Sequence, residues 1–142
     1  MDGNPAEALA TPSLELQQLS VEPLEAAGHW RIRWRVANST GGQLLLSRVG
    51  VPHGQFKGDE INFAPALVLG DREIMQFHGD VRCAEPPGLV TENAFLIFHV
   101  IWSAASWRIF ARVSVVVDSD GKPHAKTESV TTQKVGFSGV TS

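Results

Sequence analysis

The chain has 142 residues, of which 12 are Lys or Arg and 15 are Asp or Glu, for a formal net charge of −3. This charge excludes the broad positive field on which generic nucleic-acid binding depends. Hydrophobic residues make up 43% and charged residues 19%, a balance typical of a folded chain rather than a disordered one. A chain of this length folds around one core without metal or disulfide staples. We therefore expect one domain over residues 13–137, flanked by flexible tails at 1–12 and 138–142.

Three features of the sequence indicate the cellular compartment: the N-terminal residues, the apolar runs and the single cysteine. Residues 1–12 lack the basic and apolar regions of a secretion signal. The longest apolar run, Ala94–Trp102, is interrupted by His99 and is far shorter than the roughly 20 residues that span a bilayer. Cys83 has no disulfide partner and lies in an apolar strand pattern, where a buried structural thiol is common. These features predict a cytoplasmic protein that does not bind membranes.

Apolar and polar residues alternate with period two through most of the chain, which is the pattern of half-buried β-strands. The range Ser13–Val21 is predicted to be a strand with a bulge near Gln17, because its apolar residues change phase there. In the next predicted strand, 30–36, two tryptophans, an isoleucine and a valine on one face alternate with three arginines on the other.

A hairpin and a long loop are predicted in the middle of the chain. Residues 38–42, Asn-Ser-Thr-Gly-Gly, favour a tight turn into a strand at Leu44–Val51. The Gly-rich range Pro52–Glu60 is expected to be a loop. Pro65, in the middle of Ile61–Leu69, predicts an edge strand or a broken one, because proline cannot donate a hydrogen bond to a neighbouring strand.

The second half of the chain is predicted to hold four strands. Ile74–Cys83 alternates and is expected to be half buried. Asn93–Trp102 is apolar on both faces, which favours a central strand covered on both sides. Residues 107–117 form the longest clear alternation. After a hairpin loop at 118–122, the Thr-rich range 125–135 is typical of an edge strand.

About eight strands without any 3.6-residue period predict an all-β fold. We expect an antiparallel immunoglobulin-like sandwich, with a closed β-barrel as the alternative. Both architectures show the same alternation, so the pattern leaves this choice open.

Two segments carry a family resemblance. Val36–Leu44 holds an Asn/Gly turn between strands, and Leu67–Asp71 ends a strand with a Gly-acidic turn. This pattern resembles that of small bacterial immunoglobulin-like domains over residues 13–135, although the paired cysteines of true immunoglobulin domains are missing. The resemblance implies a binding or spacer module.

The sequence offers little catalytic chemistry. Five histidines are scattered without the spacing of a metal motif, so no metal and no cofactor are expected. His78 and Asp80 share a strand face, which would place a base beside an orienting carboxylate. With His53 they are the candidates for an enzyme whose site assembles only in three dimensions. His99, in the most apolar strand, is interpreted as a buried neutral imidazole, with a pH-sensing or catalytic role as the alternative.

Surface side chains are the other candidates for function. Two strands present arginines, one of them beside an outward phenylalanine, and together they suit an anionic or protein partner. The residues expected in this cationic face are Arg31, Arg33, Arg35, Arg108, Phe110 and Arg112. The competing interpretation pairs the arginines with carboxylates on neighbouring strands, such as Glu15. Phe56, in the predicted loop, is interpreted either as an exposed contact residue or as a plug for the end of the sandwich.

Three functions remain open. The leading hypothesis is a non-catalytic interaction module that binds a protein partner or itself, with Arg108, Phe110 and Arg112 at the contact. The second is a carrier for a small apolar ligand, in which a barrel cavity is lined by Trp30, Trp34, Phe95 and Phe98. The third is the enzyme described above.

Overall fold

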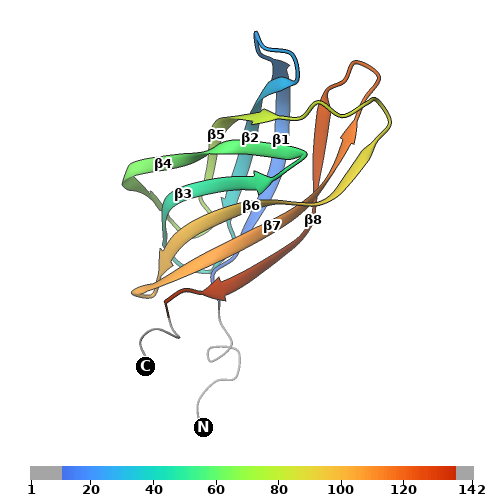
Figure 1. The fold of residues 1–142 in the computed structure, drawn as a ribbon. Helices are drawn as coiled ribbons and strands as arrows, with labels where there is room; N and C mark the ends of the chain where they lie inside the picture. The colour runs from blue at the N-terminus through green and yellow to red at the C-terminus, as the bar shows by residue number, and fades with distance from the viewer. Residues whose placement is uncertain (1–10, 137–142) are drawn as a thin grey trace.

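The computed structural model describes residues 11–136, so most of the two predicted tails lies outside the described residues. Within that range the chain forms eight strands and no α-helix (Figure 1). The strands are β1 (Leu14–Pro23), β2 (His29–Asn38), β3 (Leu44–His53), β4 (Phe56–Leu69), β5 (Ile74–Arg82), β6 (Val90–Trp102), β7 (Ala105–Val117) and β8 (Pro123–Lys134). The described residues contain no helix that is both long enough and apolar enough to cross a membrane.

All eight strands belong to one antiparallel sheet with the order β1-β2-β5-β4-β3-β6-β7-β8. The sheet curls until β1 and β8 lie side by side (Figure 1), where side chains join them. Thr127 Oγ1 donates to the carbonyl oxygen of Leu16 at 2.8 Å, and Gln18 Nε2 donates to that of Pro123 at 3.1 Å. The predicted all-β fold of about eight antiparallel strands is confirmed. The arrangement as two facing sheets is not, because the single sheet is nearly closed and barrel-like.

The strands β4 and β5 meet over a short stretch only. Lys57 pairs with Arg82 and Gly58 with Val81. A Cβ atom at Gly58 would lie 2.6 Å from the carbonyl oxygen of Asp80, so only glycine allows this close approach. Gly58 therefore joins the two strands and does not form a turn, although a Gly-Asp pair is typical of turns.

Past this junction the two strands separate, and side chains of β4 fill the gap. Phe63 packs edge to face on Phe77, with ring centroids 6.3 Å apart. Ile61 lies over Gly79, where an added Cβ would come within 2.8 Å of Ile61 Cδ1. The interior is thus sealed by packing rather than by backbone hydrogen bonds along this line.

The region predicted as a loop, Pro52–Glu60, is mostly strand. Only Gly54 and Gln55 form the turn between β3 and β4. Phe56 is 0% exposed, and its burial draws the chain after the turn into the sheet. At Pro65 the strand is neither broken nor at an edge: β4 continues through Pro65 between β5 and β3, but residues 63–66 have no partner in the register of β3 with β4.

In β2 and β7 the period-two alternation of the sequence correctly predicts which side chains face the core. The inward side chains of both strands are buried, except that Trp107 at the start of β7 is half-buried, and their arginines point outward. The sequence predicts that β6 is central and covered on both sides, and only the first part of this prediction is correct. This strand is central, between β3 and β7. Its outward side chains are not covered by a second layer, however, since Phe95 and Ile97 are half-buried and Ile101 is 41% exposed.

Candidate functional site

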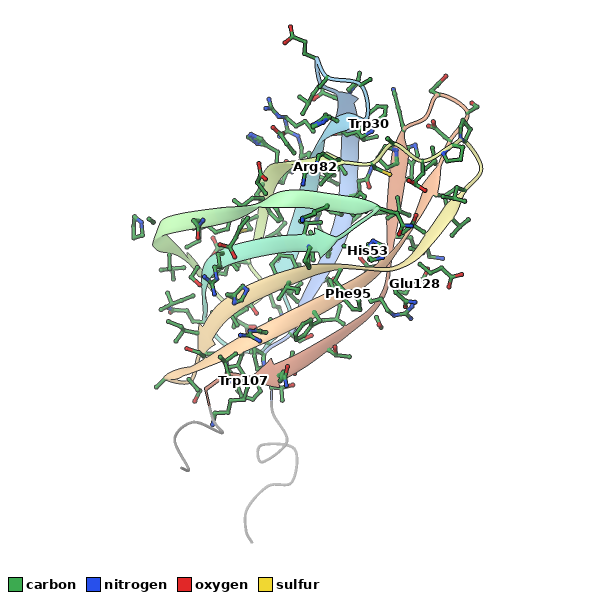
Figure 2. All side chains as sticks on the ribbon, in the orientation of Figure 1. Trp30, His53, Arg82, Phe95, Trp107 and Glu128 are labelled. Carbon is green, nitrogen blue, oxygen red and sulfur yellow. The ribbon has the colours of Figure 1, made fainter. Side chains whose placement is uncertain are left out.

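The outer face of β6 and β7 carries an apolar cluster between arginines. Phe95 on β6 (Figure 2) packs edge to face on Phe110 of β7, with ring centroids 6.4 Å apart and an interplanar angle of 89°. Ile97 lies directly opposite Phe110 in the register of the two strands. Arg108 and Arg112 lie two residues before and after Phe110, so they share its face. We call these five residues the Arg–Phe face.

A row of three basic side chains crosses the sheet beside this cluster. Arg48 on β3 is the register partner of His99 on β6, and His99 is the partner of Arg108 on β7. All three line a groove of about 460 Å³, together with Asn62 and Ser106. We call Arg48, His99 and Arg108 the basic row. Cross-strand neighbours on one face lie close enough to act together on one ligand group.

The charges around the basic row leave it positive. Arg48 Nε lies 3.6 Å from Glu60 Oε2, and both side chains are 45% exposed. Among the described residues Arg108 makes no ion pair. Three basic groups therefore face one carboxylate, which gives the groove an excess of hydrogen-bond donors and positive charge.

His99 lies half-buried on the outer face rather than buried in the interior, which corrects the preferred interpretation of this residue. Burial lowers the pKa of His99, and the charges of Arg48 and Arg108 lower it further, while Glu60 acts in the opposite direction. Its imidazole is therefore predominantly neutral at neutral pH. An anion in the groove would favour the protonated form.

The arginines of β2 do not join this surface. Arg31, Arg33 and Arg35 point outward from β2, which is separated from β7 by β1 and β8 on one side and by four strands on the other. The expected single cationic face is thus wrong, because two well-separated strands of a curled sheet point their outer residues in different directions.

Among the described residues, only one of the three β2 arginines forms an ion pair with a carboxylate. Arg31 Nε donates to Asp80 Oδ1 at 2.9 Å on the neighbouring strand. Within residues 11–136, Arg33 and Arg35 make no ion pair, and Glu15 pairs with none of the arginines. The competing interpretation therefore holds for Arg31 alone.

Phe56 is not a contact residue. Its side chain is fully buried and packs edge to face on Trp34, with ring centroids 6.4 Å apart. Two roles were open for Phe56, an exposed contact residue or a plug, and the structure supports the second, because the ring fills space in the interior.

The enzyme candidates do not assemble. Arg31 donates to both oxygens of the Asp80 carboxyl and lowers its pKa, and no hydrogen bond joins Asp80 to His78 among the described residues. His53 Nδ1 instead accepts from the backbone N–H of Gln55 at 3.2 Å, in the turn between β3 and β4. Four surface cavities of about 400–500 Å³ among residues 11–136 are lined by other residues than His53, His78 and Asp80. Residues 11–136 also hold no group of three His, Cys, Asp or Glu suited to a metal ion.

The aromatic residues proposed to line a carrier cavity have other roles. Trp34 and Phe98 are fully buried among other core rings, and Trp30 donates its indole N–H to the carbonyl oxygen of Cys83 at 2.9 Å. Phe95 points outward, as described above. The interior is occupied by packed side chains, which gives a ligand cavity there no support.

The sequence singled out Arg108, Phe110 and Arg112 but missed Arg48 and the position of His99. Their juxtaposition depends on the pairing of β3 with β6, strands that are far apart in the chain. No family model matches the chain, and no curated protein matches it either. Assignment of a function therefore rests on the geometry of this surface.

Proposed function

We propose that the protein is a non-catalytic binding module that holds a protein partner, or a second copy of itself, on the Arg–Phe face. The observation that carries this proposal is the pair Phe95 and Phe110, packed on the outer side of the sheet and flanked by Arg108 and Arg112. Aromatic and arginine side chains are enriched at the centres of protein interfaces, where other charged side chains are depleted.

We also propose that the fold is related to the immunoglobulin-like domains. The first, second and fifth strands are neighbours, and so are the third, sixth and seventh. The same grouping separates strands A, B and E from C, F and G in immunoglobulin domains. The short junction of β4 with β5 lies between the two groups and supports this relation. A relation of this kind favours a binding module without specifying its partner.

Self-association is tested by the molar mass of the purified protein, measured by light scattering over a range of concentrations. We expect a wild-type dimer and a Phe110→Glu monomer, because the substitution removes the ring that packs on Phe95, and the new carboxylate takes donors of Arg108 and Arg112 away from the partner. Gln76→Glu is the matched control: it introduces the same charge at an exposed position on β5 and is expected to leave the dimer intact.

Circular dichroism of each variant separates loss of the interface from loss of the fold. A stable monomer for wild type and variant alike excludes a second copy as the partner. A dimer that Phe110→Glu leaves unchanged would place the interface on another part of the molecule.

A further inference from the structure

Building on the proposed function, we propose that the Arg–Phe face and the basic row together recognise an extended acidic segment of a protein partner. Acidic and apolar side chains alternate in this segment, in the order acidic, any residue, apolar, any residue, acidic. The occupant follows from three parallel rows of side chains on the outer face of β3, β6 and β7.

The rows differ in chemistry. The first is the basic row, Arg48, His99 and Arg108. The second is apolar and consists of Ile97 and Phe110, with Gly50 beside Ile97 on β3. A Cβ atom at Gly50 would meet nothing within 4 Å, so the space over this row is open. In the third row Arg112 lies opposite Phe95.

The spacing of the rows matches an extended chain. Consecutive rows are two residues apart along each strand, which corresponds to about 6.8 Å. An extended peptide that lies along the strands presents its own alternate side chains to one side at the same interval. Carboxylates at its two outer positions would meet the basic row and Arg112, while the apolar side chain between them would contact Phe110.

The charges on the face favour carboxylates as its ligands. Arg108 has no ion-pair partner among the described residues, and Arg112 is held only by neutral groups, Ser129 Oγ at 3.2 Å and Asn93 Oδ1 at 3.3 Å. Both guanidinium groups therefore retain donors for an incoming carboxylate. Within residues 11–136 Glu60 is the one carboxylate that faces the basic row, and it competes with a ligand for Arg48.

His99 makes the binding depend on pH. The groups that act on its charge are Arg48 on β3, Arg108 on β7 and Glu60 on β4. The two arginines and burial keep the imidazole neutral near neutral pH, and a bound carboxylate stabilises its protonated form. Affinity should therefore rise as the pH falls from about 8 to about 5.5, a range in which glutamate stays ionised.

The probe is a blocked, dye-labelled heptapeptide with Glu, Leu and Glu at its second, fourth and sixth positions and Ser or Gly elsewhere, followed by fluorescence anisotropy. We expect saturable binding to wild type. A peptide with Gln in place of both Glu should bind about tenfold more weakly, and so should one with the two Glu adjacent and the Leu at the end.

Variants locate the site. Arg108→Gln and Phe110→Ala should each weaken binding about tenfold. Glu60→Gln should strengthen it about twofold to threefold, because it removes the competing carboxylate. Arg33→Gln is the matched control: Arg33 is also outward and unpaired among the described residues, but it lies on β2, so its loss should leave affinity unchanged. His99→Gln should flatten the rise in affinity between about pH 8 and about pH 5.5.

Several results would overturn the inference. One is that the peptide fails to saturate the protein at millimolar concentration, and another is that the Gln peptide binds as tightly as the Glu peptide. A third is that Arg33→Gln weakens binding as much as Arg108→Gln does. The last is that inorganic phosphate displaces the peptide at a concentration similar to that of the peptide. If Phe110→Ala weakens binding while Arg108→Gln and Glu60→Gln have no effect, the face binds as proposed but the acidic specificity is wrong. Self-association is judged separately by the light-scattering result.

Discussion

Trp34 on β2 and Phe56 on β4 meet edge to face in the interior, with ring centroids 6.4 Å apart and an interplanar angle of 86°. The two strands are not neighbours in the sheet, because β5 lies between them. Their side chains therefore connect parts of the curled sheet that the backbone ladder does not join directly. The contact also explains why the turn between β3 and β4 is short, since Phe56 must enter the interior immediately after it.

Trp34→Ala is expected to destabilise the protein by about 3–5 kcal/mol, because it removes a 1% exposed ring and leaves a cavity beside Phe56. The free energy of unfolding is measured by urea denaturation. Trp102→Ala is the comparison, and its loss should be smaller, since Trp102 is only half-buried. An unchanged midpoint for Trp34→Ala would contradict its place in the core.

Asn38 is the polar residue on which three segments converge. Its side-chain amide lies 2.7, 3.1 and 2.9 Å from the carbonyl oxygens of Gly42, Leu69 and Gly70, and its Oδ1 accepts from the backbone N–H of Thr40 at 2.9 Å. The side chain is 1% exposed. The motif Asn-Ser-Thr at this turn is thus explained by backbone hydrogen bonding.

Asn38→Ala should cost about 2–3 kcal/mol, because it leaves buried backbone groups without partners. Asn38→Asp should cost more, since it places a carboxylate against three carbonyl oxygens. Asn62→Ala, at an exposed position of β4, serves as the control. Thermal and urea denaturation report all three, and equal stability of Asn38→Ala and wild type would exclude a structural role for this amide.

Period-two alternation predicts which residues of β2 and β7 face the interior, because only one face of each strand is apolar. It fails for β6, where both faces are apolar and the pattern cannot say that Phe95 and Ile97 remain outside. It also fails for Phe56, whose Gly-rich surroundings are typical of a loop. The sequence could not predict the basic row for another reason. Arg48 and His99 lie side by side only because two strands that are distant in the chain pair with each other, and a one-residue shift in that pairing would separate them.

Cys83 is expected to react slowly with a thiol reagent such as dithiobisnitrobenzoate. The residue is 3% exposed, and burial raises the pKa of its thiol, so little thiolate is available at neutral pH. It is the chain's single cysteine, so the absorbance change reports this position alone. The reaction should become fast in strong denaturant. Equally fast labelling of the native protein would show that the strand end at Cys83 opens readily.

Asp118 gives the protein an acid-sensitive contribution to stability. The hydrogen bond with His124 Nε2, 2.7 Å from Asp118 Oδ2, and the backbone N–H groups of Lys122 and Asp120 lower the pKa of its carboxyl. A lowered pKa stabilises the fold above the unfolded-state pKa, and this contribution is lost as the pH falls through the folded-state pKa.

The thermal midpoint of wild type should therefore exceed that of Asp118→Asn near neutral pH, and the difference should shrink below about pH 4. Asp120→Asn removes the same charge from the same loop, where the side chain makes no hydrogen bond or ion pair among the described residues. Its midpoint should differ little from wild type at either pH. A difference for Asp118→Asn that persists unchanged in acid would rule out the carboxylate as its source.

The two-position junction of β4 with β5 and the seam of β1 with β8, which only side chains join among the described residues, divide the molecule mechanically into two shells, β1-β2-β5 and β4-β3-β6-β7-β8. Local opening starts where the fewest backbone bonds must break, so amide protons of β5 that face β4 should exchange with solvent sooner than those of β6, which is paired on both sides. Every residue of the Arg–Phe face and the basic row belongs to the second shell. The recognition surface would therefore keep its shape while the sheet opens locally between β4 and β5.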